Sequence, residues 1–91
     1  MTAAPADAAY TPRSAVMYSG PSYYYKAVAM TLPGWGVRMN CWIDTPYWSY
    51  GTNRWFHISA YAWNPYSGRG GYFAGYVSAN QVAQQTAVRR C

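Results

Sequence analysis

The sequence predicts an all-β domain built from five or six short strands that form a small barrel or a sandwich. Short runs rich in Val, Tyr and Trp are separated by Gly, Pro and Asn about every 8–12 residues, which is typical of such folds. No stretch carries a sustained apolar stripe of helical period, and the chain has no internal repeat. A length of 91 residues suits one domain with one modest hydrophobic core.

The N-terminal segment differs in composition from the rest of the chain. Residues 1–13 are mostly Ala, Pro, Thr and Asp without periodicity, so we expect a flexible lead followed by one domain at 14–91. The first residues lack the basic and apolar regions of a signal peptide and resemble the start of a mature secreted chain. No apolar run reaches the roughly 18–20 residues that a membrane-spanning helix requires. We therefore expect an extracellular protein, secreted or virion-associated, without a membrane span.

Runs of β-prone residues between turn signals give the expected elements. We expect strands at 14–18, 26–32, 36–44, 54–63, 72–78 and 86–91. The third run alternates most regularly, and its two faces are expected to carry Val37, Met39, Cys41 and Ile43 on one side and Arg38, Asn40 and Trp42 on the other. Pro and Gly indicate loops at 45–53 and 62–71, both rich in Tyr and Trp. One helical turn is expected at 80–85.

The composition indicates which residue types fill the core and which charge a binding partner is expected to carry. Aromatic residues are abundant, with 11 Tyr and 5 Trp, whereas aliphatic residues are few, so we expect the interior to use aromatic rings. Six Arg and one Lys oppose only Asp7 and Asp44, which gives a net charge of +5. A basic surface favours anionic partners such as wall polymers, nucleic acid or lipid headgroups, and it is equally typical of ordinary solubility charge.

The two cysteines predict one disulfide. Cys41 and Cys91 form an even pair in a small domain, which fits a single cross-link in an oxidising compartment. Closing a loop of about 50 residues would add on the order of 4 kcal/mol to stability. The alternative is a pair of free thiols in a reducing compartment.

Catalytic groups are scarce. The chain has one histidine, His57, and two carboxylates, of which Asp7 lies in the expected lead, so paired-carboxylate chemistry is excluded. A dyad of Cys41 and His57 would suit a wall peptidase, but it requires a free Cys41 thiol. Metal-ligand spacing and phosphate-binding glycine motifs are absent from the sequence. We therefore expect no enzyme, no metal and no cofactor.

Residues suited to ligand binding are more abundant than catalytic groups. Three consecutive tyrosines cannot all point inward, and further rings fall in the two expected loops. The candidate ligand-binding rings are Tyr23, Tyr24, Tyr25, Tyr47, Trp48, Tyr50, Trp63 and Tyr66. Arg54 and Arg69 can pair bidentately with ligand carboxylates. Alternatively, many of these rings fill a core that is poor in aliphatic residues. The Arg-Gly-Gly run at 69–71 fits a turn between strands, so we regard nucleic acid as an unlikely partner.

Several motifs resemble those of bacterial SH3-like domains. In chain order they are Val-Met-Tyr-Ser-Gly-Pro-Ser at 16–22, Ala-Met-Thr-Leu-Pro-Gly at 29–34, Val-Arg-Met-Asn-Cys at 37–41, Arg-Trp-Phe at 54–56 and Gly-Tyr-Val-Ser at 75–78. The C-terminal Gln-Thr-Ala-Val-Arg-Arg-Cys at 85–91 is similar to secreted actinobacterial members of this family. The resemblance spans about 14–91 and implies a small SH3-like barrel. The Arg that the family usually has before Ser-Gly-Pro is Tyr18 here.

The resemblance implies a binding role. It assigns residues 23–25 to the first long loop, which lies beside the ligand groove in this family. We expect a non-catalytic module that docks on bacterial cell-wall peptidoglycan or its peptides through an aromatic groove. The alternative is a protein-interaction or self-assembly subunit of an extracellular complex, a fibre or a phage virion, because exposed aromatic patches favour association.

Overall fold

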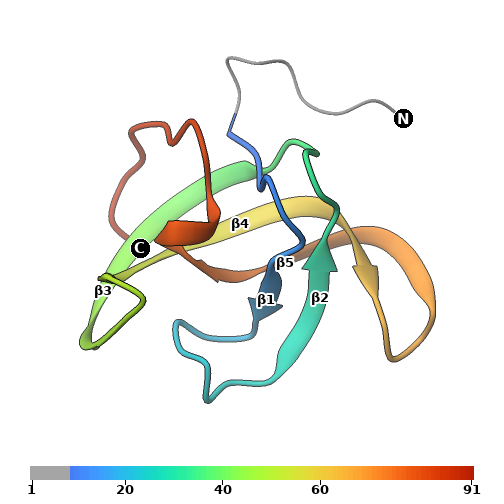
Figure 1. Ribbon diagram of the computed structural model, residues 1–91, viewed down its shortest axis with the longest axis horizontal. Helices are drawn as coiled ribbons and strands as arrows, with labels where there is room; N and C mark the ends of the chain where they lie inside the picture. The colour runs from blue at the N-terminus through green and yellow to red at the C-terminus, as the bar shows by residue number, and fades with distance from the viewer. Residues whose placement is uncertain (1–8) are drawn as a thin grey trace.

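The structure is a computed structural model that describes residues 9–91, and it confirms an all-β domain (Figure 1). The elements are β1 Val16–Tyr18, β2 Ala27–Thr31, β3 Arg38–Ser49, β4 Thr52–Asn64, β5 Arg69–Ser78 and a short 3-10 turn η1 Ala79–Gln81. Five strands match the expected number. Of the helical turn expected at 80–85, only Asn80 and Gln81 lie in η1, which begins at Ala79 and ends at Gln81.

All strand pairings are antiparallel, and four of them close a ring. β1 pairs with β2, β2 with β4, β4 with β5, and β5 with β1, while β3 lies outside this ring along β4. The closed pairing leaves few free edges and is consistent with a small barrel. β4 has 13 residues, which would span about 43 Å if straight. The molecule extends 36 Å along its longest axis, and Figure 1 shows that β4 curves along its length.

The core inside the ring is thin and made of small side chains. The core cluster consists of Ala9, Ala15, Met17, Ala29, Met39, Phe56, Ile58, Ala62, Val77, Ala79 and Val82. Phe56 is its one fully enclosed ring, although Trp42 and Phe73 pack against its edge. The expectation that rings fill the interior is therefore met only in part, because a ring of four strands encloses little space. Most Tyr and Trp side chains lie elsewhere.

A bulge in β3 changes the predicted faces of that strand. Met39 pairs with Ile58, but the register then shifts, so that Trp42 pairs with Phe56 and joins the core side. Cys41 is buried outside the core cluster. The expected grouping of Met39 with Cys41, opposite Trp42, is therefore wrong. One extra residue in a bulge inverts the alternation of all residues that follow it.

The two aromatic-rich segments are hairpin ends and not the expected loops. β3 continues to Ser49, two turn residues follow, and β4 starts at Thr52. Pro46 is tolerated because β3 is an edge strand with an irregular register in this stretch. At the other end β4 continues to Asn64 and β5 starts at Arg69. The two hairpins therefore project at opposite ends of the molecule (Figure 1).

The described N-terminal residues belong to the packed domain. Ala9 is buried, and Tyr10 bridges to Gly36 and Ala83. Thr11 is fully buried and donates a hydrogen bond of 2.7 Å to Thr31 Oγ1. The domain thus begins before the predicted boundary at residue 14. Residues 1–8 of the flexible lead expected at 1–13 lie outside the described residues.

The C-terminal tail is fixed by the predicted disulfide. Cys41 and Cys91 are bonded, with their Cα atoms 4.8 Å apart. The tail forms a single parallel bridge from Arg90 to Trp42 and not the closing strand expected at 86–91. Within residues 9–91, no helix is both long enough and apolar enough to cross a membrane.

Candidate ligand-binding groove

The aromatic side chains predicted to bind ligand are all exposed. Their exposed fractions range from 42% to 93%, for Tyr23, Tyr24, Tyr25, Tyr47, Trp48, Tyr50, Trp63 and Tyr66. The sequence reasoning missed Tyr72, which is 79% exposed. Its outward position could have been predicted from the strand alternation at 72–78, because its neighbour Phe73 packs towards the core.

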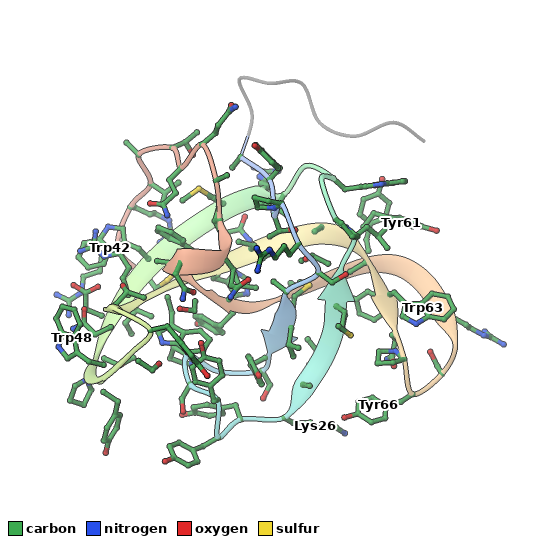
Figure 2. The ribbon with its side chains drawn as sticks, viewed as in Figure 1. Lys26, Trp42, Trp48, Tyr61, Trp63 and Tyr66 are labelled. Atoms are coloured by element: carbon green, nitrogen blue, oxygen red, sulfur yellow. A yellow bond between two sulfur atoms is a disulfide. The ribbon has the colours of Figure 1, made fainter. Side chains whose placement is uncertain are left out.

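These rings form two groups at opposite ends of β4 and not one cluster. Trp48 lies at the β3–β4 hairpin, whereas Tyr61, Trp63 and Tyr66 lie at the β4–β5 hairpin (Figure 2). The structure therefore does not bring Trp63 and Tyr66 together with Trp48, as a single groove would require. Arg69 also lies at the second end, since it pairs in register with Asn64.

A groove opens at the β3–β4 end, and it encloses about 370 Å³. The 19–26 loop forms one wall, and the last residues of β3 form the other. Trp55 of β4 also lines the groove and is 4% exposed. The full lining is Pro21, Ser22, Tyr23, Tyr24, Thr45, Tyr47, Trp48, Ser49 and Trp55. Four of the eight predicted rings therefore meet in one groove.

Edge-to-face contacts support the floor of this groove. The ring of Tyr23 lies 4.9 Å from that of Trp55, and Tyr18 lies 5.5 Å from Tyr23 and 5.9 Å from Trp55. Each such pair adds about 0.5–1.5 kcal/mol beyond burial. Burial raises the pKa of the Tyr18 hydroxyl, and the nearby Tyr23 and Tyr50 raise it further. Tyr18 is therefore a neutral phenol at physiological pH.

Tyr50 occupies an unusual position in the β3–β4 turn. Tyr50 and Gly51 have φ values of 52° and 81°, the combination that a type I′ hairpin turn requires. Asn or Gly is normally preferred at the first position, and a Tyr there costs about 1–3 kcal/mol. The Tyr50 ring is 80% exposed and stands 6.1 Å from that of Tyr23. A non-glycine residue with a positive φ and an exposed ring is the kind of backbone outlier that clusters at functional sites.

The 19–26 loop is held in place by its own hydrogen bonds. Ser19 N–H donates to Lys26 O at 2.8 Å, and Tyr24 N–H donates to Ser22 Oγ at 3.0 Å. Tyr25 does not line the groove, and its ring packs on Gly20, where an added Cβ would lie 2.5 Å from the ring. Tyr25 therefore contacts its own loop and is not one of the rings that the groove brings together.

Arg54 is engaged within the protein. Its Nε and a terminal nitrogen donate to the two Asp44 carboxylate oxygens at 2.7 and 3.0 Å. The guanidinium also lies 4.1 Å from the ring centroid of Trp42. The hydrogen bond from Arg54 lowers the pKa of Asp44. The bidentate pairing predicted between Arg54 and a ligand is thus already used by Asp44.

Cys41 and His57 do not form a nucleophile and base. The Cys41 sulfur is bonded to Cys91, which removes the thiol that the dyad requires. His57 Nδ1 instead lies 3.0 Å from Asn40 Nδ2, and Asn40 also donates to Ser59 Oγ at 3.0 Å. Among residues 9–91, no three His, Cys, Asp or Glu side chains are grouped so that they could hold a metal ion.

The groove offers stacking faces and hydroxyl groups without charge. None of its lining residues carries a charged side chain, while Ser22, Thr45 and Ser49 provide hydroxyl groups next to the rings. This chemistry suits neutral sugar rings or uncharged peptide segments. No family model, curated protein or solved structure matches this chain. What the groove binds must therefore be inferred from its own residues.

Proposed function

We propose that this chain is a non-catalytic binding module of the bacterial SH3-like class, which docks on cell-wall peptidoglycan or its peptides through the groove. The observation that carries the proposal is the convergence of four exposed rings on one groove over a buried Trp55. Aromatic anchors around a supported floor are typical of binding sites. The sequence resemblance supports the same location, because it puts residues 23–25 beside the groove of that family.

Charge and compartment support this proposal. The net charge of +5 attracts an anionic wall polymer over long range, while the uncharged groove makes the short-range contacts. The disulfide is compatible with an extracellular protein. Glycan chains provide neutral rings for stacking, and wall peptides carry carboxylates that a basic domain attracts.

Co-sedimentation with purified cell walls tests the proposal. Trp48→Ala should weaken binding about tenfold, because an exposed anchor ring is removed from the groove wall. Tyr72→Ala is the matched control, since Tyr72 is similarly exposed but lies in the β4–β5 hairpin and lines neither the groove nor any other pocket near it. It should leave wall binding within about twofold of the wild type.

Two results would contradict the proposal. The first is no co-sedimentation of the folded wild type at moderate salt. The second is equal loss of binding in Trp48→Ala and Tyr72→Ala, which would indicate non-specific adhesion of exposed rings. If the wild type binds at low salt and the first result is then obtained at moderate salt, the low-salt binding is charge attraction alone.

A second candidate function is protein interaction or self-assembly in an extracellular complex, a fibre or a virion. It is favoured by the second group of exposed rings, which includes Trp63, Tyr66 and Tyr72 at 43%, 78% and 79% exposure. A domain with two separate aromatic surfaces can bridge two partners. Sedimentation velocity over a wide concentration range tests this candidate, and a strict monomer at high concentration would exclude self-assembly.

A further inference from the structure

A second pocket lies near the β4–β5 end, separate from the groove. It encloses about 440 Å³ between the start of β2, the end of β4 and the middle of β5. Its lining residues are Lys26, Ala27, Val28, Asn64, Tyr66 and Phe73. None of these residues lines the groove. In Figure 2, Lys26 and Tyr66 lie close together at this end, far from Trp48.

The walls of this pocket are apolar and supported from below. Val28 and Phe73 are half-buried and pack directly against the hydrophobic core. Tyr66 stands above them on the β4–β5 turn and is 78% exposed. A compact apolar side chain can therefore be covered on several sides without rearrangement of the core.

Asn64 fixes the turn that carries Tyr66. Its Oδ1 accepts hydrogen bonds from the N–H groups of Tyr66 at 2.9 Å and Ser67 at 3.2 Å. Its backbone oxygen accepts a third, from Gly68 N–H at 2.9 Å. Because Oδ1 is occupied in this way, the group that remains on the Asn64 side chain is its amide NH2. The Asn64 amide and the Lys26 ammonium are therefore two hydrogen-bond donors among the lining residues.

Nothing among the described residues neutralises Lys26. The only acidic side chain at 9–91 is Asp44, and it is paired with Arg54 at 2.7 Å near the other end of β4. A second cation, Arg69, lies opposite Asn64 in the β4–β5 register and is exposed. An apolar pocket with an unpaired cation and an amide donor is complementary to a carboxylate attached to an apolar group.

The neighbouring strand edge favours a peptide as the occupant. β5 pairs with β1 only at Tyr76, so its first half, from Arg69 to Ala74, pairs with β4 alone. The other edge of this half presents backbone N–H and C=O groups that an extended peptide can pair with. Phe73, a wall of the pocket, belongs to this half.

We propose that this pocket is a second ligand site, which binds the C-terminal end of a peptide. A small apolar side chain enters between Val28 and Phe73, and the terminal carboxylate accepts hydrogen bonds from Lys26 and Asn64. The site is independent of the groove and of the ligand proposed for it. A domain with both sites can hold two segments of one polymer, or two partners, at opposite ends.

NMR titration of the full-length ¹⁵N-labelled chain tests this proposal. The probe is N-acetyl-Ala-Leu with a free carboxylate, and its C-terminal amide is the matched control ligand. The free acid should shift the amide signals of Lys26, Asn64 and Phe73, and the amidated peptide should bind at least about fivefold more weakly.

Two variants test the role of the Lys26 charge. Lys26→Gln should weaken binding of the free acid about fivefold as well. Arg38→Gln removes an exposed positive charge elsewhere and should change it less than about twofold.

Several outcomes would overturn the proposal. Equal binding of acid and amide would exclude a role for the carboxylate. Equal weakening in Lys26→Gln and Arg38→Gln would indicate attraction by net charge alone. Shifts at Tyr24 and Trp48 in place of Lys26 would move the ligand to the groove, and no shifts at millimolar peptide would exclude the site. Octanoate, titrated in parallel, identifies the source of the carboxylate: shifts with octanoate but not with the peptide would make the occupant a lipid anion.

Discussion

Trp55 and Trp63 lie on the same face of β4, eight positions apart, yet one is 4% exposed and the other 43%. Trp55 pairs with Ser78 and is covered by the rings of Tyr18 and Tyr23. Trp63 pairs with Gly70, which has no side chain to cover it. The burial of a ring on an outer sheet face therefore depends on its cross-strand and loop neighbours, and not on its own residue type.

The two ends of β4 also differ in charge and in support. The groove end has no charged lining residue, and its rings contact one another above a buried floor. The β4–β5 end, where the second pocket lies, has an unpaired Lys26. Two of the residues that line this pocket, Val28 and Phe73, pack against the hydrophobic core. One end is thus suited to a neutral ligand and the other to an anionic one. If the two ends are independent, a change at one end should leave the structure and the binding at the other end unaltered.

Loss of the disulfide should have the largest effect on stability. Replacing Cys41 and Cys91 by Ser should lower the free energy of unfolding by about 4 kcal/mol, because the bond closes a loop with a sequence separation of 50. The tail should detach from β3, where Trp42 N–H now donates to Arg89 O and Cys91 N–H to Trp42 O. Urea denaturation measures the loss, and reduced wild type is the control that should match the double variant.

Hydrogen exchange shows which end the disulfide supports. We expect faster exchange at Trp42 and Cys91, and unchanged exchange in the β4–β5 hairpin at Ala62 and Gly71, which is distant from the tail. Uniformly faster exchange at both ends would contradict the proposed independence. It would indicate that the domain opens only as one cooperative unit.

Substitution of the two tryptophans should have the next largest effect. Trp55→Ala should cost about 3 kcal/mol, at the lower end for a buried Trp, because the Tyr23 ring can partly fill the space. Trp63→Ala should cost less than about 1 kcal/mol, since Trp63 is already 43% exposed. Urea denaturation of both variants gives the difference. Similar costs would mean that Trp63 is more important to the fold than its exposure indicates.

The sequence predicted the strands better than it predicted the ends of the hairpins. Five strands, the disulfide and the outward rings follow from alternation, cysteine count and composition. The segment at 45–53 was predicted as a loop because Pro46 and Gly51 normally interrupt strands, and only the edge position of β3 makes Pro46 acceptable. The bulge before Cys41 leaves no signal in the residue types, so the faces of β3 could not be assigned.

The sequence also could not predict that the exposed aromatic rings fall into two groups at opposite ends of β4. Trp48 and Trp63 both occur in segments with turn signals, and residue types alone do not say that β4 separates them. The separation depends on the length of β4, which has 13 residues, whereas the sequence predicted a strand of ten residues at 54–63 between two loops. Arg54 was predicted to meet a ligand because nothing in the sequence pairs it with Asp44. That contact depends on the β3–β4 register, which joins the two residues directly.

The smallest expected effect concerns Asp44, whose ion pair with Arg54 lies at the groove end of β4. Because the hydrogen bond from Arg54 lowers the pKa of Asp44, the ionised carboxylate favours the folded state. This contribution is complete above the ordinary Asp pKa of 3.8 and is lost as the pH falls through the lowered pKa of the folded protein. Both side chains are exposed, 43% and 39%, so solvent screens the pair and Tm should change by only about 1 °C. Thermal unfolding at pH 6 and pH 2.5 should therefore show a slightly smaller pH dependence for Asp44→Asn than for the wild type. A larger difference would mean that the Asp44–Arg54 pair also holds Trp42 and the disulfide-bonded tail in place, through the contact of Arg54 with the Trp42 ring.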